Sequence, residues 1–192
     1  MQSWSCDWEI KEYWDKVVAS QELSEVYRKE FRQDLSRFNV FYPHTVVDIG
    51  GGAFGGVFHF LDIGRRKILL DPCATEFKKR YSLIPEDVEL VDAYCNKMPL
   101  GDDSVDVVFC IETLDHCNTI EDYMESANEI VRILRKGGKL YFMLPLRKSQ
   151  IDGHFISLET MTLDDIIKPF RGLKNECNII ENHLYLTGEK RE

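Results

Sequence analysis

The feature that most constrains this chain is a glycine-rich turn directly after a short apolar run. Residues 46–56 read Val-Val-Asp-Ile-Gly-Gly-Gly-Ala-Phe-Gly-Gly. Glycine is needed where the backbone must turn sharply and come close to a ligand, because a Cβ atom would block the approach. A strand that runs into such a turn is typical of the first βα unit of an α/β sheet.

From residue 44 onward, short apolar runs alternate with amphipathic stretches. The runs are apolar on both faces, which fits parallel strands buried between two helix layers. This alternation predicts a doubly wound, mostly parallel α/β sheet with a ligand site at the carboxyl ends of its strands. The expected strands are Thr45–Ile49, Lys67–Leu70, Val88–Val91, Val105–Ile111 and Lys139–Leu144.

Three stretches predict helices. Apolar residues recur every three or four positions over 7–38, and the aromatic residues of this leader either pack on the domain or roof a ligand site. A second helix is expected after the N-cap Thr119, as in a capping box, and should end at the glycine pair 137–138. A third is expected from about Thr162 to Pro169.

The last part of the chain predicts a β-hairpin. Residues 173–188 form two strand-like runs joined near Glu181 and Asn182, which would add antiparallel strands at the edge of a seven-stranded sheet. A length of 192 residues suits one domain. We therefore expect a single domain over 1–192, with a helical leader or lid at 1–43 and an α/β core at 44–192.

The composition of the chain limits the kinds of partner that the protein can bind. The net charge is −9, from 24 basic and 33 acidic residues, so binding to nucleic acid is disfavoured. No apolar run is long enough to span a bilayer, and the first ten residues do not resemble a signal peptide. Six scattered cysteines without a Cys-x-x-Cys pair predict free thiols in a reducing compartment, hence the cytoplasm, and no zinc site.

Two cofactor classes compete for the glycine turn. Gly50, Gly52 and Gly55 match G-x-G-x-x-G, and Asp71 follows at a distance suited to a ribose hydroxyl, as in NAD-binding folds. Asp48, two residues before the first glycine, argues against this, because its carboxylate would repel a pyrophosphate. It would instead hold a cationic group, directly or through the turn, or simply bind amides of the turn.

Further motifs follow in a fixed order. Asp92-Ala93 comes after the third strand, Pro-Leu-x-Asp-x-Ser-Val-Asp-Val-Val occupies 99–108, and Arg-x-Leu-Arg-Lys-Gly-Gly occupies 132–138. With the glycine turn and Asp71, this order resembles the class I S-adenosylmethionine-dependent methyltransferases, from about Thr45 to Leu146. The resemblance implies a Rossmann-like methyltransferase fold, with S-adenosylmethionine as cofactor and S-adenosylhomocysteine as product.

The resemblance also implies residue roles on the methionine and ribose side of the cofactor. Asp48, Gly50 and Gly52 would surround the methionine part. Asp71 would accept hydrogen bonds from the ribose hydroxyls, with Pro72 beside the adenine.

On the adenine side, the resemblance implies that Asp92 takes the adenine amino group and that Ala93 lies near the ring. Ile111, at the end of the fourth strand, would contact the cofactor through its backbone. The family's usual third glycine position is Phe54 here, followed by Gly55, so the path of the turn departs from the family pattern.

The segment after the fourth strand carries the candidate chemistry. His116 is the candidate general base, because the ordinary pKa of histidine lies near working pH. Glu112, Asp115 and His116 also resemble a Glu-x-x-Glu-His segment that holds a divalent ion in ubiquinone-pathway and small-RNA 2′-O-methyltransferases. His154 would supply a further ligand. We rank this Mg²⁺ site below a metal-free one, because Asp115 is shorter than the family's glutamate.

These observations predict an enzyme that methylates a small molecule or a glycan, by O-methylation. Two alternatives stay open. One is a non-catalytic module that binds the cofactor or a partner with the same fold. The other is an RNA ribose methyltransferase, which the acidic charge disfavours.

Overall fold

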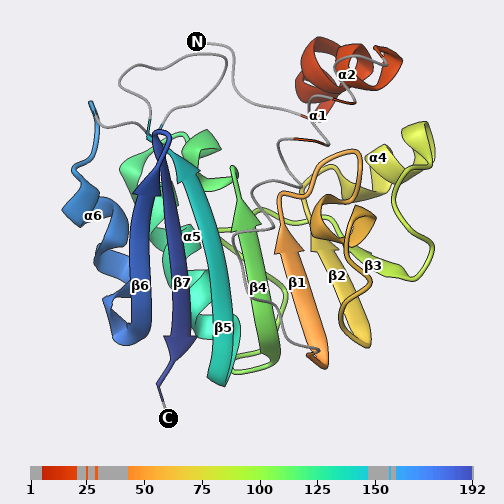
Figure 1. The fold of residues 1–192 in the computed structure, drawn as a ribbon. Coiled ribbons are helices and arrows are strands. Elements are labelled where there is room, and N and C mark those ends of the chain that lie inside the picture. The colour runs from red at the N-terminus through yellow and green to blue at the C-terminus, as the bar shows by residue number, and fades with distance from the viewer. Residues whose placement is uncertain are drawn as a thin grey trace.

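A seven-stranded sheet forms the centre of the protein, in the order β3-β2-β1-β4-β5-β7-β6 (Figure 1). The computed structural model describes residues 6–20, 25, 29, 43–146, 156 and 159–191. Strands β1 to β5 are mutually parallel, whereas β7 is antiparallel to both β5 and β6. The strands are β1 Thr45–Ile49, β2 Arg66–Leu70, β3 Val88–Val91, β4 Val105–Ile111, β5 Leu134–Pro145, β6 Leu173–Ile180 and β7 His183–Lys190.

This topology confirms the predicted doubly wound fold and its antiparallel C-terminal hairpin. The hairpin turns at Glu181 and Asn182, whose φ angles are 48° and 64°. Two successive residues with positive φ make the type of two-residue turn that follows the twist of antiparallel strands. Strand β6 is one of the two edge strands of the sheet, and β7 lies between it and β5.

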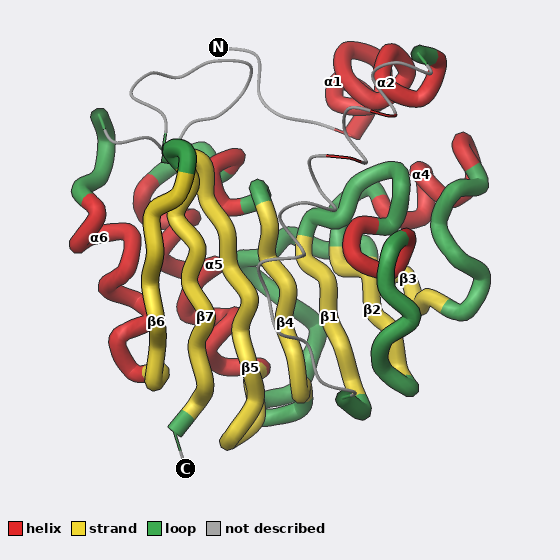
Figure 2. The backbone as a smooth tube through the Cα atoms, in the orientation of Figure 1, coloured by secondary structure: helices red, strands yellow, loops and turns green. Residues whose placement is uncertain are grey.

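Two apolar cores lie on opposite faces of the sheet, because successive strand residues point to opposite sides. Val47 and Val108 belong to the core under α5 (Ile120–Ile133) and α6 (Leu163–Ile167), which lie beside β5, β7 and β6 in Figure 2. Val46 and Phe109 belong to the other core. That core is covered by α4 (Ala74–Tyr81), the 3-10 turn η2 (Gly56–His59) and the N-terminal helices.

Helix α5 ends earlier than predicted. The side chain of its N-cap Thr119 accepts a hydrogen bond from the amide of Asp122, as expected. The helix stops at Ile133, however, and residues 134–138 already belong to β5. The β4–β5 register shifts between Val105 and Val107, and the Nε of Arg135 donates to Asp106 at 2.5 Å. Pairing with β4 therefore outweighs the helix-favouring pattern of this segment.

The leader is not one helix over 7–38. The described part consists of α1 (Cys6–Glu9), a π-helical turn η1 (Ile10–Trp14) and α2 (Asp15–Ala19). Ser20 then leaves the helix with φ −95° and ψ 112°. Most of the predicted helix beyond Ser20 lies outside the described residues.

The third helix starts where predicted and ends at Ile167, before Pro169, as predicted. Thr162 and Asp165 form a complete capping box in front of α6, in which each side chain binds the other's backbone amide. After Ile167 the chain continues as a separate 3-10 turn, η4 (Lys168–Gly172), which contains Pro169. Proline is tolerated there because it lies in the first turn of η4.

The cysteine prediction is wrong for one pair. Cys6 and Cys73 form a disulfide, with Cα atoms 5.5 Å apart, although 67 positions separate them in the sequence. They meet because α1 packs next to the residues that follow β2. Cys95, Cys110, Cys117 and Cys177 are free thiols. Within the described part of the chain, no helix has the length and apolar character needed to cross a membrane.

Candidate functional site

Three aspartates lie at the carboxyl ends of three neighbouring strands. Asp48 is in β1, Asp71 follows β2 and Asp92 follows β3. Asp71 binds the glycine turn directly, because the amide of Gly52 donates to its Oδ2 at 3.3 Å. Asp92 is exposed and accepts a hydrogen bond from the amide of Thr75 at 2.8 Å. The structure therefore brings the predicted acidic residues and the glycine turn to one edge of the sheet.

Asp48 lies underneath the glycine turn rather than in front of it. Its carboxylate is buried, and its Oδ2 accepts a hydrogen bond from the amide of Val57 at 2.8 Å. A Cβ on Gly51 would lie 2.7 Å from that oxygen, and a Cβ on Gly56 only 1.7 Å from it. Glycines 51 and 56 thus leave room for the carboxylate. The carboxylate of Asp48 thus binds the backbone amide of Val57, and its role toward a cofactor stays a prediction.

Two carboxyl groups of the site have raised pKa values, mainly because they are buried. Burial raises the pKa of Asp48 to about 8, with a further rise from Asp71, although the amide of Val57 lowers it. Burial also raises the pKa of Asp71 to about 7, and Glu9 adds to the rise. Both carboxylates would ionise more readily beside a positive charge. A cationic ligand therefore fits this edge of the sheet better than a pyrophosphate.

The first two motif glycines are needed for their conformation and for close contacts. Gly50 and Gly52 have φ angles of 72° and 61°. A Cβ on Gly50 would lie 2.3 Å from the methyl group of Thr113, and one on Gly52 would lie 2.3 Å from the ring of Trp14. Side chains from two distant segments therefore rest on the turn.

Thr113 was not among the predicted site residues. Its hydroxyl donates to the carbonyl oxygens of Ile49 at 2.8 Å and of Ile111 at 3.1 Å. It therefore fastens the end of β1 to the end of β4, beside Gly50. A threonine after an apolar strand has no distinctive pattern, so the sequence carried no signal for this role.

Trp14 belongs to the leader, whose aromatic residues were expected to pack on the domain or to roof a ligand site. Its indole Nε1 donates to Glu9 at 2.9 Å, and its ring is buried against Phe54 and Phe77. Figure 1 shows α1 and α2 beyond the arrowheads of β1 and β2. We call residues 6–19 the lid segment, since they cover the glycine turn at Gly52.

The remaining predicted cofactor contacts lie at the same strand ends. The carbonyl oxygen of Pro72 is 3.3 Å from the Sγ of Cys6. Ala93 is half-buried and packs against the core under α5. Ile111 is buried, and its carbonyl oxygen is held by Thr113. Their roles toward a cofactor stay predictions.

His116 lies in the 3-10 turn η3 (Leu114–His116) after β4 and is exposed. Its amide donates to the carbonyl oxygen of Thr113, the residue before η3, at 3.1 Å, which closes this 3-10 turn. Glu112 lies 3.4 Å from the Nε2 of His183, on β7. Asp115 is fully buried.

The candidate metal ligands do not converge. Asp115 is buried, His116 is exposed, and Glu112 is exposed and near His183. Across residues 6–20, 25, 29, 43–146, 156 and 159–191, no three His, Cys, Asp or Glu side chains are grouped to hold a metal ion. His154 lies outside the described residues.

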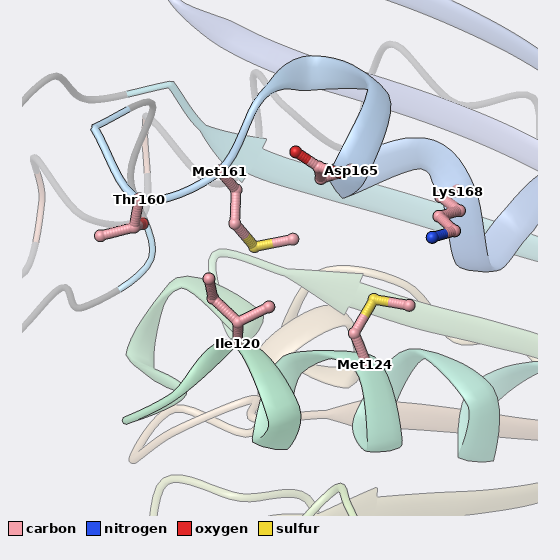
Figure 3. A pocket seen from close by; sticks show the side chains of 6 residues that line it. All are labelled: Ile120, Met124, Thr160, Met161, Asp165 and Lys168. Atoms are coloured by element: carbon pink, nitrogen blue, oxygen red, sulfur yellow. The ribbon is translucent and has the colours of Figure 1, made fainter.

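A small cavity of about 260 Å³ lies elsewhere, between α5 and α6 (Figure 3). Figure 3 shows Met124 and Met161 pointing toward each other across it. Asp165, on its wall, is engaged in the capping box of α6. None of the predicted site residues lines this cavity. The strand ends are therefore the stronger candidate site.

Comparison with protein families identifies the central part of the chain. A family model described as a methyltransferase domain matches residues 47–142. An uncharacterized protein of Methanocaldococcus jannaschii is 28% identical over 153 residues, which are 74% of this chain. The aligned region is only 64% of that relative's length.

Two solved structures illustrate the similarity in fold. A chain from the complex between the Haloferax volcanii Trm112 methyltransferase activator and a methyltransferase superposes with a TM-score of 0.71 and 18% identity, covering 94% of this chain and 98% of that one. A Methanococcus maripaludis structure, described as an S-adenosyl-L-methionine-dependent methyltransferase, gives 0.69 and 16% identity, covering 100% and 97%. At such identities these matches show the fold alone.

Proposed function

Because this chain belongs to the methyltransferase-domain family, as its resemblance to class I S-adenosylmethionine-dependent methyltransferases implied, we propose that it transfers a methyl group from S-adenosylmethionine. The observation that carries this proposal is the set of carboxylates at the ends of β1, β2 and β3 around a glycine turn. When bound, S-adenosylmethionine supplies a methyl group on a sulfonium sulfur.

The charges and the shape of the site support this cofactor. Burial is the main cause of the raised pKa values of Asp48 and Asp71, and a nearby positive charge, such as a sulfonium or an ammonium group, would favour their ionised forms. Asp71 already accepts hydrogen bonds from the amides of Gly52 and Cys73. A carboxylate has about four acceptor positions, so Asp71 can also accept from ribose hydroxyls. Asp92, exposed at the next strand end, would take the adenine amino group.

For the acceptor, we propose a hydroxyl of a small molecule or a glycan. The protein must align this acceptor with the methyl carbon and remove its proton. His116 is exposed at the end of β4 and tied through its backbone to Thr113, so it would be the group that accepts the proton. The net charge of −9 works against an RNA substrate.

The second candidate function is a methyltransferase that needs a protein partner for activity. The Haloferax volcanii neighbour, which was solved in complex with an activator, supports this candidate. We place the chain in the cytoplasm, as its sequence suggests. Methyl transfer that appears only after a co-purified partner is added back to the isolated chain would support a partner-dependent enzyme.

The test of the cofactor is calorimetric titration of the oxidised protein with S-adenosylhomocysteine, with NAD⁺ in parallel. We expect saturable binding of S-adenosylhomocysteine, weakened about tenfold or more in Asp71→Ala, because hydrogen bonds to a charged group each contribute about 1.5–3 kcal/mol. Glu176→Ala removes an exposed carboxylate from β6 and should bind normally. Binding of NAD⁺ alone would overturn the proposal.

The test of the acceptor chemistry is His116→Ala, assayed with the acceptor that a screen of hydroxyl compounds identifies. Removal of a general base should lower kcat by about 10²–10⁴-fold. Cofactor affinity should stay unchanged, because His116 is exposed and is not one of the residues predicted to hold the cofactor. An unchanged kcat would exclude His116 as the base.

A further inference from the structure

We propose that the Cys6–Cys73 disulfide is a redox-controlled latch, which holds the lid segment over the glycine turn and slows the exchange of the cofactor. The inference rests on the proposed cofactor site and adds its regulation. Reduction of the latch by a dithiol would free the lid segment, and exchange of the two thiols with a disulfide oxidant, which becomes a dithiol, would close it.

The latch attaches next to a residue that shapes the site. The amide of Cys73 donates to the Oδ1 of Asp71 at 2.8 Å, and the Sγ of Cys6 lies 3.3 Å from the carbonyl oxygen of Pro72. The disulfide therefore joins the first helix of the chain to the loop that would hold the ribose and the adenine. A cofactor bound at Asp71 would lie next to this covalent bridge.

The lid segment covers the glycine turn with a large side chain. The ring of Trp14 rests on Gly52, so close that a Cβ there would lie 2.3 Å from it. Glu9 receives the indole N–H of Trp14 and also faces Asp71 closely enough to raise its pKa. A ligand reaching Gly52 from this side must displace Trp14, so the position of the lid segment controls access.

Apart from the disulfide, the lid segment is held to the core by apolar packing and by hydrogen bonds of Asp15. Its buried apolar side chains are Ile10, Trp14 and Val17. Asp15 binds Arg80 at 2.8 and 2.7 Å and the hydroxyl of Tyr81 at 2.9 Å. The Asp15–Arg80 pair is partly exposed, and such pairs contribute little to stability.

The lid segment is also too short a helix to be stable alone. Residues 6–19 form one continuous helical run of 14 residues, of which the middle five make a π-helical turn. The segment therefore depends on what ties it to the core. Removing a covalent tie should then raise the population of open lid segments, since local opening is governed by such contacts.

Thiol–disulfide exchange supplies the chemistry of the switch. In a reducing compartment, disulfides of ordinary proteins are mostly transient, catalytic or redox-sensing. In the switching step, a dithiol gives up two electrons and two protons and becomes a disulfide. The Sγ–Sγ bond breaks, and Cys6 and Cys73 become thiols.

The first test follows the lid segment itself. Hydrogen exchange of the amides in residues 6–19 is measured by mass spectrometry on air-oxidised and dithiothreitol-reduced protein. We expect exchange to be about tenfold faster or more after reduction, because a disulfide strongly restrains the chain that it closes. Cys6→Ser should exchange like the reduced protein in both conditions. Cys177→Ser, which removes an exposed thiol on β6, should respond like the unaltered protein.

The second test follows the cofactor. Stopped-flow mixing with S-adenosylhomocysteine should give association and dissociation rates about tenfold higher in the reduced protein and in Cys6→Ser. Equal association and dissociation rates in both redox states would show that the latch does not control cofactor exchange.

Other outcomes separate this inference from the proposed function. Absence of a Cys6–Cys73 cross-link in peptide maps of the oxidised protein, or equal hydrogen exchange in both redox states, would overturn the latch. Failure of S-adenosylhomocysteine to bind in either redox state would overturn the proposed function. The hydrogen-exchange experiment would still test the latch, because it needs no cofactor.

Discussion

At the scale of single residues, the glycine turn is explained by what lies below and above it. The carboxylate of Asp48 lies below Gly51 and Gly56, whereas Trp14 lies against Gly52 and Thr113 against Gly50. Each of these four glycines leaves space for a specific neighbouring group. The pattern that suggests a ligand-binding turn is therefore also a packing requirement of the turn itself.

Replacement of Gly56 by alanine should destabilise the protein strongly. The new Cβ would lie 1.7 Å from the Oδ2 of Asp48 and 2.8 Å from the Cα of Gly51, at a φ of 53°. Overpacking and a left-handed backbone together cost about 2–4 kcal/mol. The free energy of unfolding from urea denaturation measures this loss.

The matched control is Gly172→Ala, since a Cβ at Gly172 would have no neighbour within 4 Å. Its free energy of unfolding should change by about 0.5 kcal/mol or less. Similar losses in both variants would contradict the role assigned to Asp48 and the turn.

At the scale of elements, helix α5 covers part of one face of the sheet, and the positions of its two ends have different causes. Its start is fixed locally by the side chain of Thr119. Its end is fixed by β4, which takes Leu134 into the sheet. Its middle is fastened to α6, because the hydroxyl of Tyr123 donates to the carbonyl oxygen of Ile166 at 2.8 Å.

Replacement of Thr119 by alanine should lower the free energy of unfolding by about 1 kcal/mol, because the amide of Asp122 loses its side-chain acceptor. Thr119→Ser keeps the oxygen and should stay close to the unaltered protein. Urea denaturation compares the three proteins. Equal stability of the alanine and threonine forms would show that water replaces the cap without cost.

At the scale of the whole molecule, two buried carboxylates make stability depend on pH. Asp48 and Asp71 ordinarily titrate near 3.8, but burial raises their folded-state pKa values to about 8 and about 7. Between about pH 4 and the raised pKa of each group, the folded protein keeps a proton that the unfolded chain has released. Stability from these groups is therefore present below about pH 4 and is lost as the pH rises toward 8.

We expect Tm of the oxidised protein to fall as the pH is raised from 5 to 8.5. In Asp48→Asn the fall should be smaller by about 5 °C, since each kcal/mol shifts Tm by about 2–4 °C in a domain of this size. Thermal denaturation followed by circular dichroism at several pH values measures the slope. The same slope in both proteins would mean that Asp48 is ionised in the fold.

Much of the arrangement could be predicted from sequence, because it depends on near neighbours. The strands around Thr45–Ile49 and Val105–Ile111, the hairpin turn at Glu181 and the cap at Thr119 follow from local patterns, as does the family resemblance. Such patterns can be recognised in the sequence alone, because the hydrogen bonds and side-chain burial that cause them involve residues only a few positions apart.

Only the tertiary structure decided how distant segments meet. The contact of Trp14 with Gly52, the bridge from Cys6 to Cys73 and the fastening of β1 to β4 by Thr113 each join parts of the chain that no local pattern relates. The early end of α5 has the same cause, since pairing with β4 outweighs the local preference for helix. Local chemistry thus determined the elements and the turn, whereas the packing of segments far apart in sequence determined what covers the turn.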